Sequence, residues 1–268
     1  RSGYRPFGLS ARTLPHHPQR QDDELLSSWV VAIARANDCK VHSLCSRLVG
    51  NQHVTWTRDI DRLAPSWLIQ GLAEFVAQQP EQVACASVDA RVRLLSTTHE
   101  CMGWGKWVLP LGIWHRRRRL TGVQYCPLCL RFDAKPYVRV SWRLAFYTEC
   151  EWHHCMMRDR CHACEAPFEY FRGELGQRFK IEAPSMNVCT SCGEDLGYGP
   201  VAKACWPNWP LTYNVRNLLM MNSTDVAVIG NRLFNQPSDL WLALRQVIAL
   251  MSSRGRAGEI YDAAAKQL

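Results

Sequence analysis

The chain has 268 residues, of which 47% are hydrophobic and 21% charged, and its formal net charge is +8. This length and apolar content suit a soluble globular protein of one large or two small domains. No apolar run reaches the roughly 18 residues that a membrane helix needs, and the basic first twenty residues lack the apolar stretch of a secretory signal. We therefore expect no membrane association and a cytoplasmic location.

The positive charge is concentrated in one part of the chain. Residues 1–90 hold nine basic and nine acidic residues, and residues 144–268 hold twelve and thirteen. Residues 91–143 hold eleven Lys and Arg but only two acids, Glu100 and Asp133. Such a local excess predicts a polyanion partner, most often nucleic acid, and a solvated basic surface is the alternative.

Apolar residues at helical spacing predict a helix over residues 24–36, capped by Asp22, and a second over residues 41–49. Two helices joined by a short turn are compatible with a helix-turn-helix, and packing in a helical bundle is the alternative. In the first case Lys40 and Arg47 would contact nucleic acid. Further helices are predicted over residues 65–77, 82–95, 211–221, 239–251 and 259–266.

Four pairs of metal-ligand residues follow one another at regular spacing. They are Cys126-x2-Cys129, Cys150-x2-His153, Cys161-x2-Cys164 and Cys189-x2-Cys192. In a reducing compartment such pairs indicate zinc, because a C-x2-C turn presents two sulfurs to one ion. Pairing in sequence order predicts two Zn²⁺ sites with four protein ligands each. Sites without an open position are structural rather than catalytic.

Two alternatives remain open for these ligands. An interleaved, RING-like pairing is possible in principle, but the seven residues between His153 and Cys161 favour sequential pairing. His154 is the rival of His153, since C-x3-H is also sterically reasonable. Cys155 and His162 lie close in sequence to the ligands without being assigned to either site.

A run of four arginines stands just before the first cysteine pair. The predicted contacts to a phosphate backbone are Arg116, Arg117, Arg118, Arg119, Arg131, Lys135, Arg139 and Arg143. Arg139 and Arg143 flank Trp142 closely enough that a structural role, pairing with acids, is the alternative for these two.

The sequence has no P-loop, no H-E-x-x-H and no Gly-x-Ser-x-Gly motif. This favours a binding protein over an enzyme. We expect a mainly α fold with small zinc-ribbon units, an N-terminal helix-turn-helix-like domain and C-terminal helices. The predicted divisions are an N-terminal helical domain at 1–115, a tandem zinc-binding region at 116–200 and a C-terminal helical segment at 201–268.

Two stretches resemble the TniQ family of transposition proteins. Residues 13–37 carry a proline-rich lead, then Glu-Leu-Leu and Ser-Trp. Residues 125–168 carry Tyr-Cys-Pro-x-Cys, Arg-x-Ser-Trp-Arg, Cys-x-x-His and Arg-Cys-x-x-Cys. The family commonly has Cys-Pro-Glu-His-Gly where this chain has Cys-Glu-Trp-His-His at residues 150–154, and it often has Arg where this chain has Ala32.

The resemblance implies a bacterial, non-enzymatic protein that helps to select the insertion site in DNA transposition. It implies a AAA+ ATPase transposition regulator as partner. It also implies either direct reading of an attachment site in DNA, or guide-type RNA and CRISPR effector subunits that do the reading. A homodimer is left open. The alternatives are a sequence-specific, zinc-containing DNA-binding regulator and, less favoured, a RING-like zinc protein.

Overall fold

The computed structural model describes residues 13–50, 55, 58–88, 107–111, 113–115, 118–120, 122–171, 185–204, 227–229, 232–234 and 237–252. Within these ranges the fold is mainly helical and contains little strand. No helix in the described part of the chain is long and apolar enough to cross a bilayer. The chain forms two compact units, residues 1–90 with 108–207 and residues 91–107 with 208–268.

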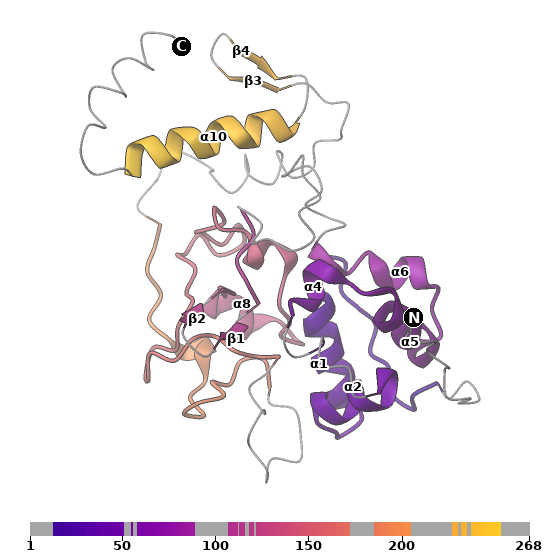
Figure 1. Cartoon of the computed structure of the whole chain (residues 1–268). Coiled ribbons are helices and arrows are strands. Elements are labelled where there is room, and N and C mark those ends of the chain that lie inside the picture. The colour runs from indigo at the N-terminus through magenta and orange to yellow at the C-terminus, as the bar shows by residue number, and fades with distance from the viewer. Residues whose placement is uncertain are drawn as a thin grey trace. The chain divides into compact units, whose positions relative to one another are not determined.

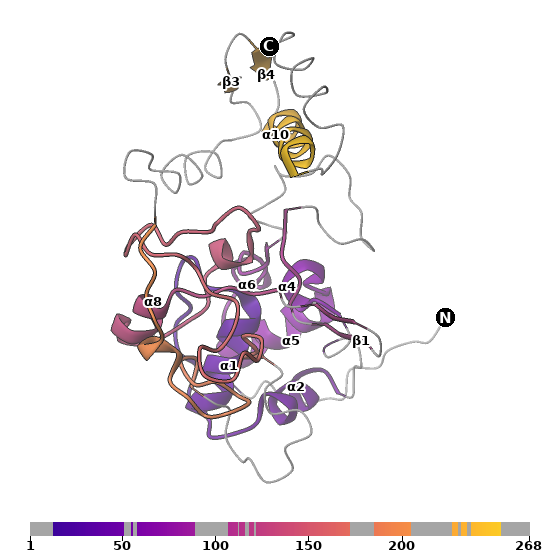
Figure 2. The ribbon, with the colours of Figure 1, turned by 90° about the vertical axis from the view of Figure 1, so that its left-hand side faces the viewer.

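The first unit begins with a group of helices. They are α1 (Leu26–Ala36), α2 (Val41–Val49), α4 (Ile60–Leu63), α5 (Ser66–Val76) and α6 (Pro80–Ala84). Helix α1 contacts α2 and α4, and α5 contacts α2 and α6 (Figures 1 and 2). The helices predicted over residues 24–36, 41–49 and 65–77 are confirmed to within two residues at each end. The one predicted over 82–95 begins at Pro80 and ends at Ala84, and its remainder from residue 89 lies outside the described residues.

Helix α1 is buried on nearly all sides rather than along one stripe. The predicted apolar stripe is buried, but Ser27 and Ser28 on another side of the helix are also inaccessible to solvent. The helix starts without a side-chain cap at Leu25, so the expected cap by Asp22 is wrong. The Glu24 carboxylate instead accepts hydrogen bonds from the Gln21 amide and the Ser28 hydroxyl.

The remainder of the first unit has short elements. It contains the antiparallel hairpin β1 (Ile113–His115) and β2 (Arg118–Leu120), then α8 (Pro127–Phe132) and the 3-10 turns η2 (Val140–Arg143) and η3 (Leu196–Tyr198). Between these elements the chain is held by isolated β-bridges. Within residues 137–148 the one regular helical element is the 3-10 turn η2.

The extended segment 137–140 docks against the start of α1. The Leu25 amide donates to the Val138 carbonyl at 3.0 Å, and the Val138 amide donates to the Ser28 hydroxyl at 3.0 Å. The Val140 amide donates to the Asp23 carbonyl at 2.7 Å. The sequence stretch at residues 125–168 therefore packs directly on the stretch at residues 13–37.

The second unit contains the antiparallel hairpin β3 (Ala227–Ile229) and β4 (Arg232–Phe234), and the helix α10 (Pro237–Ser252). Helix α10 contains the helix predicted over residues 239–251. In this unit the Trp107 and Trp241 rings meet edge to face, with centroids 5.6 Å apart. The helices predicted over 211–221 and 259–266 lie outside the described residues.

Candidate metal centres

The eight predicted ligands form two clusters, and each could hold one metal ion. Within each group of four, the ligand atoms all lie within 4.8 Å of one another. The groups are Cys126, Cys129, Cys150 and His153, and Cys161, Cys164, Cys189 and Cys192. The clusters follow the sequential pairing, so the interleaved RING-like pairing is not the one that the fold produces.

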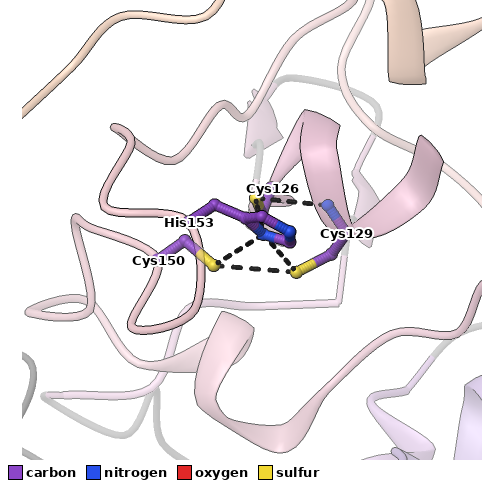
Figure 3. Close-up of side chains that lie close together, drawn as sticks. All are labelled: Cys126, Cys129, Cys150 and His153. Carbon is purple, nitrogen blue, oxygen red and sulfur yellow. Dashed lines mark hydrogen bonds between the residues drawn. The ribbon is translucent and has the colours of Figure 1, made fainter. Parts of the chain in front are cut away.

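In the first cluster the imidazole of His153 faces three thiols (Figure 3). Its Nδ1 lies 3.5 Å from Cys126 Sγ, 3.3 Å from Cys129 Sγ and 3.6 Å from Cys150 Sγ. The sulfurs of Cys129 and Cys150 are 3.6 Å apart. A tetrahedral zinc ion with Zn–S of about 2.3 Å and Zn–N of about 2.0 Å requires ligand atoms roughly 3.5 to 3.8 Å apart. The spacing and the donor types therefore fit Zn²⁺.

His154, the rival ligand, lies elsewhere. Its side chain is 74% exposed, and its Nδ1 lies 3.4 Å from Glu149 Oε1. The backbone of His154 is left-handed, with φ of 49°. Its amide donates to the Cys150 carbonyl at 2.9 Å and closes the turn that presents Cys150 and His153. His154 is thus the residue that ends this turn.

Three of the four ligand turns have the same backbone geometry. At Cys150, Cys161 and Cys189 the carbonyl accepts from the amide four residues later, at 2.9, 3.1 and 2.9 Å, and the amide donates to the carbonyl five residues later, at 2.8 Å each. The residue after the second ligand is left-handed in each case, at His154, Glu165 and Gly193. The remaining pair, Cys126 and Cys129, lies at the start of α8, where Cys126 Sγ accepts a hydrogen bond from the Cys129 amide at 3.4 Å.

The second cluster is more open than the first. Its Cys161–Cys192 and Cys164–Cys189 sulfur distances are both 3.7 Å. Cys161 and Cys189 are buried, but Cys164 and Cys192 are exposed. In the first cluster all three cysteines are buried and only the imidazole is partly accessible.

The crowding of thiols around Cys126 perturbs their acidity. Hydrogen bonds from Cys129, Cys150 and Cys155 lower the pKa of Cys126, and the contact with Cys126 raises the pKa of Cys129. Ionisation of the Cys126 thiol therefore opposes ionisation of the Cys129 thiol. A divalent cation removes this competition, because ligation stabilises every thiolate at once.

A fifth cysteine lies beside the first cluster. Cys155 Sγ is buried and lies 3.5 Å from Cys126 Sγ. It does not belong to the group of four ligand atoms that surround one point. Its position next to a ligand was visible in the sequence, but its proximity to Cys126 comes from the fold.

Two of the predicted nucleic-acid contacts are buried structural residues. The Arg143 side chain has no exposed surface, donates to Asp61 Oδ2 at 2.8 Å and also pairs with Asp59. The Arg139 side chain is 7% exposed and lies 2.9 Å from an oxygen of Asp133. We therefore correct the expectation for both residues, since guanidinium groups enclosed in this way cannot reach a phosphate backbone. Sequence reasoning missed Asp59 and Asp61, which stand more than 80 residues before Arg143 without any shared motif.

The other predicted contacts are placed as follows. Arg118 and Arg119 belong to β2 and pair with His115 and Trp114 of β1, whereas Arg116 and Arg117 lie outside the described residues. Arg131 and Lys135 are exposed at and after the end of α8. On α2, Arg47 is exposed, and Lys40 precedes the helix as a half-buried residue.

Comparison with known proteins adds one family match. The family model TniQ matches residues 15–157, just over half of the chain. The matched range includes all four residues of the first cluster and ends before the second. A search of curated proteins found no match for the chain.

Proposed function

The chain belongs to the TniQ family, which is associated with target selection in DNA transposition, and from this premise we propose that it is a non-catalytic targeting adaptor. In this role it links a targeting module to a AAA+ transposition regulator. The targeting module is either attachment-site DNA or a CRISPR RNA-guided effector complex. The observation that carries the proposal is the family match over residues 15–157.

The two clusters support an adaptor rather than a metalloenzyme. Each would supply four protein ligands to one Zn²⁺, which leaves no coordination position for water or substrate. Zinc bound in this way stabilises a segment that has few regular elements of its own. The metal would therefore hold the docking surfaces of the adaptor in place.

The basic hairpin supports contact with nucleic acid. Arg118 and Arg119 lie in β2 of a two-stranded antiparallel ribbon, a form that other proteins place in a DNA groove. Contacts of arginine with phosphate position a protein without reading sequence. Binding through them should weaken with a log–log salt slope of roughly −0.9 for each neutralised phosphate.

A transposition assay tests the adaptor role. The mobile element with and without the gene for this chain is transferred into a recipient, and insertions at the target site are counted by sequencing. We expect target-site insertions to fall to background without the chain, and complementation by the full chain to restore them. Unchanged insertion frequency and position would overturn the proposal. Co-purification of the tagged chain with CRISPR effector subunits, or with the AAA+ ATPase alone, distinguishes the two targeting routes.

A second candidate is a sequence-specific DNA-binding regulator that uses α2 for recognition. Helix α2 buries Val41, Leu44 and Cys45 but exposes His42, Ser43 and Arg47, so one polar side is available. A footprint by the isolated chain on one defined sequence, lost in Ser43→Ala with Arg47→Ala, would support this candidate. The adaptor with CRISPR targeting predicts no such footprint.

A further inference from the structure

Three large aromatic side chains are exposed around the first metal cluster. Phe132 is 66% exposed, Trp152 58% and Tyr198 64%. Single exposed apolar residues are common, but a group of rings at one place indicates an interaction site. None of the three rings is needed as a ligand of either cluster.

Arg131 connects two of these rings. Its Cζ lies 4.4 Å from the centroid of the Tyr198 ring and 5.3 Å from that of Phe132. The Phe132 ring in turn lies 6.2 Å from the ring of His153, centroid to centroid. Trp152 directly precedes His153 in the same ligand turn. We call Arg131, Phe132, Trp152 and Tyr198 the aromatic platform.

The fold holds in place the segments that carry the aromatic platform. Phe132 ends α8, which Cys126 caps, and Trp152 stands between the ligands Cys150 and His153. Tyr198 ends η3, which packs on α8 and is capped by the Asp195 side chain. A Cβ at Gly197 would lie only 3.1 Å from the Arg131 Cβ, so the two segments approach as closely as the glycine allows.

The charges at the platform favour an anionic partner. Among the described residues Arg131 makes no ion pair with a carboxylate, and Lys135 and Lys203 are exposed on neighbouring segments. Asp133, the acid next to Phe132, is already paired with Arg139. Aromatic rings and arginine are enriched at protein–protein interfaces as well, but lysine is depleted there. The exposed lysines therefore favour a single strand, which proteins bind with rings and a positively charged groove.

We propose that the aromatic platform binds unpaired nucleotides of a single-stranded nucleic acid, with bases stacked on the rings of Phe132, Trp152 and Tyr198 and a phosphate at Arg131. Bases in a duplex are stacked on each other and present no free face to these rings. The proposal deepens the proposed function and rests on its choice of nucleic acid as partner. It assigns the single strand to the platform and leaves duplex contact to the β1–β2 hairpin.

Fluorescence anisotropy with the zinc-loaded full chain tests this. The probes are a labelled 12-nucleotide oligothymidylate, an oligouridylate of the same length and a duplex of the same length, at low salt. We expect both single strands to bind, and we expect Phe132→Ala and Trp152→Ala each to weaken this binding about tenfold, since stacking on one ring supplies roughly that factor. Duplex affinity should stay within about twofold.

Matched controls separate the platform from general effects. Leu63→Ala removes an exposed apolar side chain from α4, and Arg35→Ala removes an exposed arginine from α1, so both should bind single strands like the unchanged chain. Metal content is measured for each variant, and retention of both ions shows that the fold is intact.

Three outcomes would overturn the platform proposal. They are no single-strand binding by the unchanged chain, unaltered binding in the two ring variants, or ring variants that bind single strands normally and lose a protein partner instead. In each case a positive transposition assay would leave the adaptor role standing, whereas a chain that binds single strands but has no effect on insertion would contradict the adaptor role alone.

Discussion

Arg143 Nη1 donates a hydrogen bond to Asp61 Oδ2 over 2.8 Å, and neither side chain is exposed to solvent. Asp61 also accepts from the amide and the hydroxyl of Ser27, at 2.7 and 2.8 Å, and that hydroxyl lies 2.6 Å from the Tyr170 hydroxyl. This network joins α1 and α4 to the segments that carry the metal clusters. This buried network is therefore one of the connections between the helices and the metal-binding segments of the first unit.

Removing the arginine should destabilise the first unit strongly. Arg143→Met leaves Asp59 and Asp61 buried without a cation, and breaking a buried pair in this way costs about 3–5 kcal/mol. Lys135→Met removes a cation from an exposed position and should change stability by less than about 0.5 kcal/mol. Urea unfolding of the zinc-loaded chains measures both, and equal effects of the two substitutions would contradict the structural role of Arg143.

Asp61 should titrate far above an ordinary aspartate. Burial raises its pKa from 3.8 to about 6, against the opposing charge of Arg143. Because the folded state then holds the proton more tightly than the unfolded state, this group's contribution to stability is present below about pH 4 and is lost as the pH rises to about 6. Carbon-13 NMR of the Asp61 carboxyl should give a midpoint near pH 6.

The variant Asp61→Asn supplies the matched control for this titration. Acidification also weakens zinc ligation, so the informative quantity is the difference in unfolding free energy between the unchanged chain and the variant at each pH. As the pH rises from 4 to 6, we expect the unchanged chain to lose unfolding free energy relative to the variant. A difference that does not vary with pH in this range would show that Asp61 is ionised in the usual way.

His154 carries a left-handed backbone that glycine would adopt without strain. With φ of 49° it ends the turn that presents Cys150 and His153, at the position where the family commonly has Gly. His154→Gly should therefore stabilise the chain by roughly 1 kcal/mol and keep the full metal content. His154→Ala retains a Cβ and should give no such gain, as thermal unfolding would show. Loss of one ion in either variant would contradict the placement of His154 outside the cluster.

His153 should be required for the first ion. His153→Ala, made in a Cys155→Ser background so that the neighbouring thiol cannot substitute, removes one of four ligands. Elemental analysis should find one zinc per chain, against two for Cys155→Ser alone. Two ions in the double variant would assign the fourth ligand to another residue.

The two centres should differ in reactivity. Cys164 and Cys192 are exposed, whereas the three cysteines of the first cluster are buried. Among the seven ligand cysteines, alkylation with iodoacetamide followed by peptide mass spectrometry should modify Cys164 and Cys192 first, with early release of one zinc to a colorimetric chelator. Simultaneous modification of both clusters would indicate that the fold opens as a whole.

The local features of this fold could be predicted from sequence, and the long-range ones could not. The ranges of α1, α2 and α5 followed from apolar spacing, and the two groups of four ligands followed from paired spacing. A structural role for Arg139 and Arg143 was one of the two alternatives that the sequence left open, but their partners Asp23, Asp59 and Asp61 could not be named because they come from distant segments. Because both arginines stand in the basic stretch, the sequence favoured solvent exposure. Only the tertiary packing decides between exposure and burial.

The folded structure also decides between His153 and His154 as the fourth ligand. Both fit the ligand spacing, and the difference lies in the backbone: the turn after Cys150 places a left-handed residue at His154, as it does at Glu165 and Gly193. The aromatic platform also required the fold, because Phe132, Trp152 and Tyr198 are spread over 67 residues of sequence. The predicted division of the chain at residues 115 and 200 stays a prediction.

Native mass spectrometry of the full chain, purified without added metal or chelator, tests the central claim that two closed zinc centres hold this adaptor together. The account predicts one dominant species with two zinc ions per chain and no disulfide. A folded chain without zinc, or with its eight ligand positions engaged in disulfides, would contradict it.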